Sequence, residues 1–132
     1  MRAISILFTV ILVLASCATP PEPEFTTDIH LVSFDQLPQY WVLKKDNIKF
    51  ATKPGELPSV SCGFVVLEYL IDSNGNVFSP VIKEAEPEGA WDWEALKSLS
   101  LMEFLPAESN PNRTPVRVTQ RTVFKMGDED CQ

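Results

Sequence analysis

The sequence has little of what catalytic and metal-binding sites require. It contains a single histidine, His30, three cysteines and five glycines, with no Gly-rich phosphate loop and no Cys/His spacing that suits zinc. Asp28, Ser33 and Asp35 lie near this histidine in sequence, but a catalytic triad needs its members to converge in a pocket. We therefore interpret His30 as a solvated side chain, and we predict a protein that is not an enzyme and holds no cofactor or metal ion.

Basic side chains and long apolar runs are also scarce. The chain has 11 Lys and Arg against 18 Asp and Glu, a net charge of −7, which argues against binding to nucleic acid or to anionic lipid surfaces. The apolar run from Ile4 to Ala15 is shorter than the about 20 residues that a membrane-spanning helix needs. With 132 residues, the chain is expected to form one domain.

The N-terminal run instead has the features of a secretion signal. Arg2 precedes the run and small residues end it, as in a signal peptide. Its last residues, Leu14-Ala15-Ser16-Cys17, resemble a bacterial lipobox, which implies cleavage before Cys17 and attachment of a diacylglyceryl group to its sulfur. The alternative is an ordinary signal peptide in which Cys17 is incidental.

A lipidated Cys17 would place the protein in the cell envelope of a Gram-negative bacterium, facing the periplasm. Acyl chains contribute about 0.8 kcal/mol per buried CH₂, so two or three chains together give a stable anchor. Ala18, the next residue, resembles the signal for sorting to the outer membrane. We predict a lipoprotein signal peptide over residues 1–16, followed by the lipidated cysteine and a Pro-rich tether over residues 17–30.

The most informative stretch is Cys62 to Val77. Its residues from Gly63 to Ile71 include one charged side chain and are rich in β-branched and aromatic residues, which favour a strand. Asp72-Ser73-Asn74-Gly75 follows, and Asn-Gly between two apolar runs favours a hairpin because both residues tolerate the positive φ of a primed turn. The second strand, Phe78 to Ile82, contains Pro80, which suits a sheet edge.

A helix and a last strand follow the hairpin. The stretch from Trp91 to Met102 predicts a helix with one apolar side, made of Trp91, Ala95, Leu96, Leu99 and Met102. The stretch from Val116 to Met126 alternates as a strand does. One of its faces carries Val116, Val118, Thr122, Phe124 and Met126, and the other carries Arg117, Thr119, Arg121 and Lys125.

These elements predict an α+β fold. We expect a small three-stranded antiparallel sheet of order 2-1-3 with one helix packed on a face, because a helix between two strands is a crossover that joins parallel strands. This order brings Cys62, at the start of the first strand, close to Cys131, after the last strand. We therefore predict a disulfide between them. The alternative is a buried free Cys62 and a frayed Cys131.

Several motifs resemble the C-terminal domain of the TonB family, in an order and spacing that extend from Cys62 to Met126, about half of the chain. They are Gly63-x-Val65-x-Leu67-x-Tyr69-x-Ile71-Asp72, Gly75-Asn76-Val77, Trp91-Asp92-x-x-Ala95-Leu96, Phe104-x-Pro106-Ala107 and Arg113-Thr114-Pro115-Val116. The resemblance implies the fold of that domain. It also implies a domain that captures an extended segment of a receptor by adding it to the sheet as a strand.

Residues 31–58 are expected to form an N-terminal extension that packs on a domain made of residues 59–132. Two short strands, or a strand and a helical turn, fit this extension equally well, because Leu37-Pro38 breaks any long helix. We expect its Tyr40-Trp41-Val42 segment to cover the face of the sheet opposite the helix. That face would otherwise expose apolar side chains of the first strand, and a partner protein is the alternative cover.

The last strand is the predicted binding site, because an edge strand offers unpaired N–H and C=O groups to an extended peptide. The predicted partner-binding residues are Arg117, Thr119, Arg121, Val123 and Lys125. Their basic side chains would favour an acidic peptide, or would act as gatekeepers that blunt a bare edge. We predict a non-catalytic envelope lipoprotein that binds an extended peptide or envelope protein. The alternative is an accessory protein of TonB-dependent outer-membrane transport that binds a receptor segment.

Overall fold

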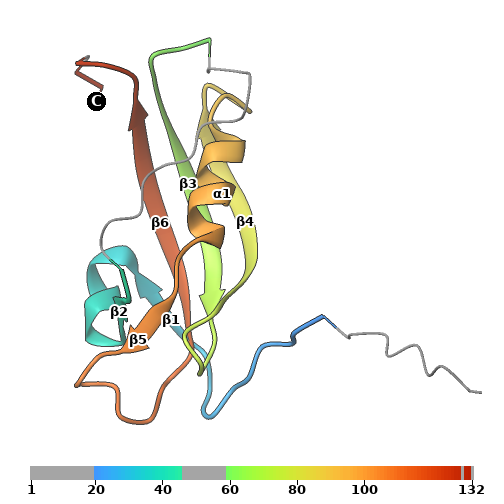
Figure 1. Ribbon diagram of the computed structural model, residues 1–132, viewed down its shortest axis with the longest axis vertical. Helices are drawn as coiled ribbons and strands as arrows, with labels where there is room; N and C mark the ends of the chain where they lie inside the picture. The colour runs from blue at the N-terminus through green and yellow to red at the C-terminus, as the bar shows by residue number, and fades with distance from the viewer. Residues whose placement is uncertain (1–19, 46–58, 129, 132) are drawn as a thin grey trace, which may run out of the picture.

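The computed structural model describes residues 20–45, 59–128, 130 and 131. The predicted signal peptide, Cys17 and residues 46–58 of the extension lie outside the described residues. In chain order the elements are β1 (His30–Ser33), the 3₁₀ helix η1 (Phe34–Gln39), β2 (Trp41–Leu43), β3 (Cys62–Ile71), β4 (Val77–Glu86), α1 (Asp92–Ser100), β5 (Phe104–Pro106) and β6 (Val116–Lys125) (Figure 1). No helix among the described residues is long and apolar enough to cross a membrane.

The main sheet has the strand order β1-β6-β3-β4. β3 pairs antiparallel with both β4 and β6, so the predicted order 2-1-3 is confirmed for these strands. The predicted number of three strands is wrong, because β1 adds a fourth strand parallel to β6, with His30 beside Val116 and Ser33 beside Thr119. Only Val32 of this four-residue strand is buried. One buried residue gives no periodic pattern, so the sequence could not indicate which strand this stretch pairs with.

The turn between β3 and β4 differs from the predicted primed turn, since Gly75 has a positive φ (83°) and Asn74 does not. The Gly75 N–H donates to the Asp72 carbonyl and the Asp72 N–H to the Asn76 carbonyl, both at 3.0 Å, which closes a three-residue loop. The Asp72 carboxylate accepts hydrogen bonds from the N–H groups of Asn74 and Asn76 at 3.0 and 2.9 Å, and these favour the observed turn.

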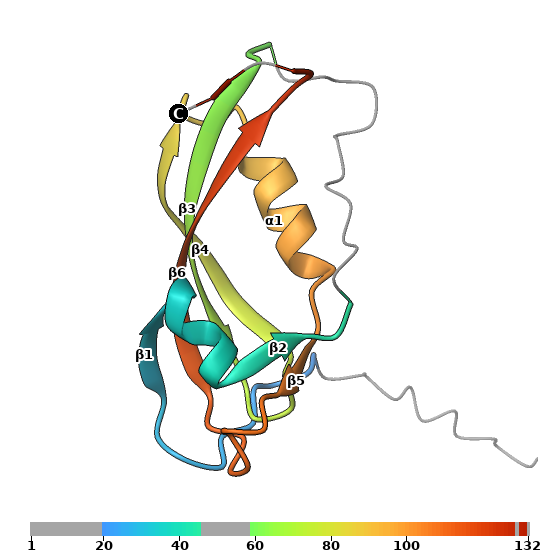
Figure 2. The same cartoon turned by 90° about the vertical axis from the view of Figure 1, so that its left-hand side faces the viewer.

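α1 packs on one face of the sheet, and its predicted apolar side faces the core. The residues concerned are Trp91, Ala95, Leu96, Leu99 and Met102. The antiparallel pair of β2 and β5, which the sequence did not reveal, lies on the same side of the sheet as α1 (Figure 2). The helix and the N-terminal extension therefore share one face of the sheet between them.

Trp41 lies in the core on this side, and the prediction that its segment covers the opposite face is wrong. Its side chain is 1% exposed, and its indole N–H donates to the Thr114 carbonyl at 2.9 Å. The reason is the pairing of β2 with β5, in which Trp41 lies opposite Pro106. This pairing holds the extension against the helix side of the sheet, away from Phe64 and Val66 on the other face.

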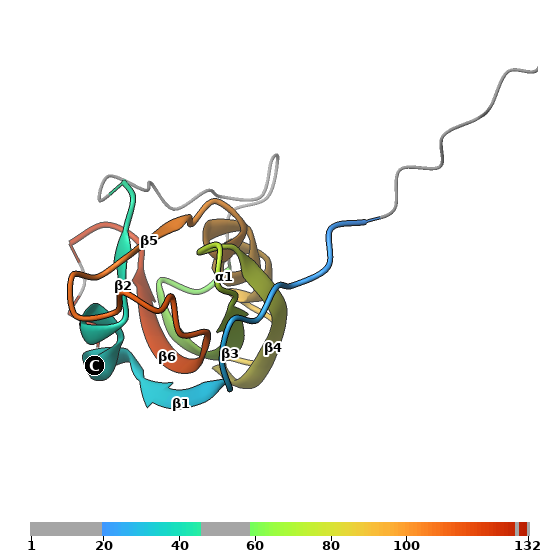
Figure 3. The same cartoon turned by 90° about the horizontal axis from the view of Figure 1, so that it is seen from below.

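The segment before β1 is tied to the β3–β4 turn by hydrogen bonds. The Ser73 N–H donates to the Glu24 carbonyl at 2.9 Å, and the Glu24 N–H donates to Asp72 Oδ2 at 3.1 Å. The Thr26 N–H donates to Ser73 Oγ at 2.9 Å. Because Asp72 and Ser73 are buried, these bonds fix the entry to β1, which lies at the margin of the sheet beside β6 (Figure 3).

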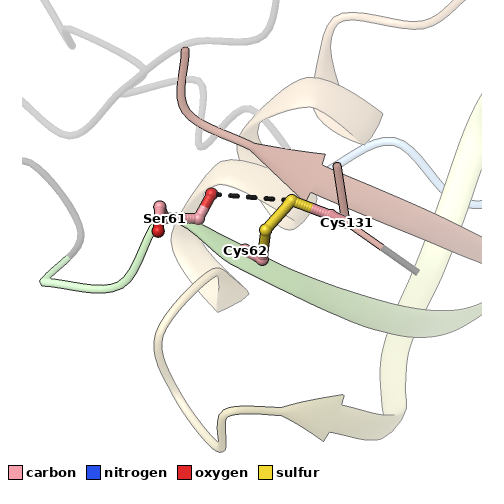
Figure 4. Close-up of a disulfide and its surroundings, with 3 residues drawn as sticks. All are labelled: Ser61, Cys62 and Cys131. Atoms are coloured by element: carbon pink, nitrogen blue, oxygen red, sulfur yellow. Dashed lines mark hydrogen bonds between the residues drawn. A yellow bond between two sulfur atoms is a disulfide. The ribbon is translucent and has the colours of Figure 1, made fainter. Parts of the chain in front are cut away.

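A disulfide joins Cys62 to Cys131, as the sequence predicts (Figure 4). Cys62 begins β3 opposite Lys125 of β6, and the Met126 N–H donates to the Ser61 carbonyl at 2.7 Å. The two cysteines are 69 residues apart in sequence, and a loop of that length implies a stabilisation of about 4 kcal/mol on a chain-entropy estimate. The disulfide holds the end of β6 against the start of β3, far from β1.

We expect Trp41→Ala to destabilise the protein by about 3–5 kcal/mol, because it removes a buried aromatic side chain and leaves a cavity. Trp93→Ala is the matched control, since Trp93 is 36% exposed and its loss should cost less than about 1 kcal/mol. Urea denaturation of both variants measures the difference. Equal losses of stability in the two variants would contradict the burial of Trp41 in the core.

Candidate functional site

β6 is paired along its whole length on one side and along less than half of it on the other. β3 pairs with every residue of β6, from Val116 to Lys125. On the other side, β1 pairs only with residues 116 to 119 before the chain turns into η1, and β6 runs well past the end of β1 (Figure 1). Among the described residues, no strand pairs with the outer side of β6 from Gln120 to Lys125. We call this outer side of residues 120–125 the open edge.

The main-chain groups of alternate residues in β6 point to opposite sides. The Pro115 carbonyl accepts a hydrogen bond from the His30 N–H of β1 at 3.0 Å, whereas the Met126 N–H points the other way, to Ser61 beside β3. Because these directions alternate along a strand, odd-numbered residues of β6 turn their N–H and C=O outward. On the open edge these residues are Arg121, Val123 and Lys125.

The structure divides the five predicted partner-binding residues into two groups. Arg117 and Thr119 lie beside Leu31 and Ser33 of β1, so their prediction as open edge residues is wrong. Arg121, Val123 and Lys125 lie beyond β1, and among the described residues no strand takes their outward groups. The open edge therefore holds three of the five predicted residues.

The side chains of these edge residues project from the face opposite α1. Arg121 pairs with Val66 of β3, and its guanidinium carbon lies 4.1 Å from the centroid of the Phe64 ring. This cation–π contact covers part of the Phe64 ring, which lies on the face that the sequence predicted to be exposed without a cover. Arg117 lies 3.7 Å from the Glu68 carboxylate. Among the described residues no carboxylate is within ion-pair distance of Arg121, so no ion pair balances its positive charge at the open edge.

A largely apolar cavity of about 280 Å³ lies beside the open edge, on the helix side of the sheet. It is formed where η1, β2, β5 and the segment after α1 meet. The apolar side chains that line it include Phe34, Leu37, Trp41, Val42, Met102 and Phe104. Because Leu37, Trp41 and Phe104 are buried in the core, the inner wall of the cavity is held in place by the fold itself.

Gln120 is the polar residue that lines this cavity, and its amide already has partners. Its Oε1 accepts a hydrogen bond from the Tyr69 hydroxyl at 2.8 Å, and its Nε2 donates to Thr122 Oγ1 at 3.2 Å. Burial raises the pKa of the Tyr69 phenol well above its usual value of about 10, so the phenol stays protonated and acts as the donor. The cavity is therefore suited to an apolar group.

The single histidine lies away from both features. His30 is exposed, its Nδ1 lies 3.4 Å from the Tyr40 hydroxyl, and the two rings meet edge to face at 5.8 Å. No hydrogen bond between described residues links it to Asp28, Ser33 or Asp35. Within residues 20–45, 59–128, 130 and 131, no group of three His, Cys, Asp or Glu side chains is placed to hold a metal ion.

The cavity escaped the sequence reasoning because its walls come from short elements far apart in the chain. β2 and β5 each begin with a buried aromatic residue that is followed by an exposed apolar one. All residues of both runs are apolar, so no polar–apolar alternation marks them in the sequence. Runs of three residues are too short to identify strands, and nothing in the sequence indicates that these two runs pair. The pairing signal exists only in the folded protein.

Comparisons with known proteins establish the fold. No protein-family model and no curated protein matches the chain. Among solved structures, the chain is similar to the solution NMR structure of the C-terminal domain of TonB from Pseudomonas aeruginosa, with a TM-score of 0.58 and 17% sequence identity over 75% of this chain and 97% of that one. The TonB-like fold predicted from residues 62–126 is thereby confirmed.

The buried Tyr69 phenol, which donates a hydrogen bond to Gln120, gives a pH-dependent prediction. Because the pKa of Tyr69 is raised in the folded protein, the unfolded chain releases the proton first, near pH 10, and stability falls as the pH rises further. We expect a loss of up to about 1.4 kcal/mol per pH unit from this group. Tyr69→Phe should lack this component when the two proteins are unfolded in urea between pH 9 and 11.5. Equal slopes would contradict the burial of this phenol.

Proposed function

We propose that this chain, which has the fold of a TonB C-terminal domain, is a non-catalytic envelope lipoprotein that binds an extended segment of another envelope protein. The segment would add to the sheet as a strand along the open edge. Anchoring through a lipid on Cys17, in the outer membrane and facing the periplasm, is part of the proposal. The domain would then act as a binding or scaffolding module held near the membrane.

The observation that carries the proposal is the half-covered state of β6. Arg121, Val123 and Lys125 turn main-chain donors and acceptors outward, in line with β1 and without a strand partner among the described residues. Main-chain hydrogen bonds of this kind supply the affinity in strand addition. β1 supports the proposal, since it is itself a short strand that pairs with residues 116–119 on the same side of β6.

The fold favours one more specific candidate, an accessory protein of TonB-dependent transport. In that case the bound segment would belong to an outer-membrane receptor. The same edge would serve both functions, and the identity of the captured protein decides between them.

A photo-crosslinking residue in place of Arg121 tests the proposal in cells. We expect it to capture a partner, and we expect the capture to be lost when Val123→Pro is added, because proline removes the outward N–H and blocks an added strand. Val123→Thr keeps the N–H and should keep the capture.

A crosslinking residue in place of Lys83, on the strand at the opposite edge of the sheet, is the control for position. Proline is tolerated where the N–H faces outward, so Val123→Pro should melt cooperatively. Capture that survives Val123→Pro in the folded protein, or that is equal from Lys83, would contradict strand addition at the open edge. A receptor segment among the captured species would favour the transport role.

A further inference from the structure

We infer that the apolar cavity beside the open edge is the specificity site for the bound segment, and that the segment alternates large apolar residues with acidic ones. One apolar side chain enters the cavity while its acidic neighbours meet the basic side chains of β6. This inference rests on the proposed strand addition and adds the chemistry of the partner to it.

The cavity lies where an added strand would place a side chain. Gln120 lines the cavity and directly precedes Arg121, the first outward residue of the open edge. Phe34, the first residue of η1, also lines the cavity and directly follows Ser33, where β1 ends. A segment that continues the line of β1 along β6 therefore meets the cavity at its first residues.

The pleat of the sheet determines which side chains of the segment enter the cavity. Successive residues of a strand project to opposite faces. The cavity lies on the helix side, with Gln120, whereas Arg121 and Lys125 project to the opposite face beside Val66 and Cys62 of β3. The residues of the segment that face the cavity are therefore flanked by residues that face Arg121 and Lys125.

The size and polarity of the cavity limit what it can accept. Its volume of about 280 Å³ lies just below the range of roughly 300–1,000 Å³ that sites for drug-sized ligands occupy. The amide of Gln120, the one polar side chain among the lining residues, already forms hydrogen bonds with Tyr69 and Thr122. These features fit one or two apolar side chains better than a cofactor.

Charge decides between a foreign segment and a second copy of this chain. Two copies of β6 paired antiparallel about Val123 would place Arg121 of each beside Lys125 of the other, and like charges opposite each other destabilise a sheet. Arg121 has no carboxylate partner among the described residues, so an acidic side chain of a foreign segment supplies one. The charge pattern favours an acidic segment over self-association.

The test is an NMR titration of the purified protein with three capped six-residue peptides. The first alternates leucine with glutamate, the second has serine in place of leucine, and the third has lysine in place of glutamate. We expect the first peptide to shift the amide resonances of Arg121, Val123 and Lys125 together with the methyl resonances of Val42 and Met102. The serine peptide should bind roughly ten- to a hundredfold more weakly, since the leucine side chain is no longer buried. The lysine peptide should also bind more weakly.

Phe34→Ala removes one wall of the cavity, and Phe25→Ala is its matched control, since Phe34 is 47% exposed and lines the cavity while Phe25 is 49% exposed and does not. Phe34→Ala should lower the affinity for the leucine–glutamate peptide by about tenfold and leave the affinity for the serine–glutamate peptide unchanged. Phe25→Ala should change neither affinity. Leucine and serine peptides that shift the edge amides with equal affinity would overturn the inference and leave the proposed function standing. Peptides that shift the cavity methyl groups without the edge amides, or that shift neither, would count against both.

Discussion

The structure depends on the pairing of β3 with β6. These strands pair from Cys62 with Lys125 to Ile71 with Val116, and their side chains on one face form the centre of the core. The disulfide holds one end of the ladder, and the bonds of Asp72 and Ser73 to residues 24–26 hold the other. Every other element packs against this ladder or extends it. β3 takes the main-chain hydrogen-bonding groups along the whole of one side of β6. The proposed function of the sheet therefore depends on what pairs with the groups on the other side.

The N-terminal segment pairs with only part of this outer side of β6. β1 pairs with the first four residues of β6, and the chain then leaves the sheet through η1 to reach β2 and β5. This departure has two consequences at one place. It leaves the open edge beyond Thr119, and it forms the apolar cavity between η1, β2 and Gln120. An edge for main-chain hydrogen bonds and a cavity for a side chain are the two parts that strand-addition sites combine.

Local signals in the sequence were sufficient to identify most of the helices and strands. They were not sufficient to identify which strands far apart in the chain pair with each other. The alternation in Val116–Met126 and the apolar side of α1 identified their elements, and the strand order followed from connection rules. The position of β1 was not predictable, because one buried residue, Val32, gives no pattern that specifies a partner strand. The pairing of β2 with β5 also has no local signal in the sequence. For that reason Trp41 was predicted on the wrong face of the sheet and the cavity was not predicted. Arg121, Val123 and Lys125 were among the predicted edge residues because side chains alternate along a strand, and their role in binding stays a prediction.

The most direct test of this structure is amide hydrogen exchange along β6 in the unliganded protein. Arg117 and Thr119 should be protected by β1, and Gln120, Thr122 and Phe124 should be protected by β3. Arg121, Val123 and Lys125 should exchange much faster than these neighbours, which would give alternating protection only beyond residue 119. Uniform protection from residue 117 to residue 125 would contradict the open edge, and with it the proposed mode of binding.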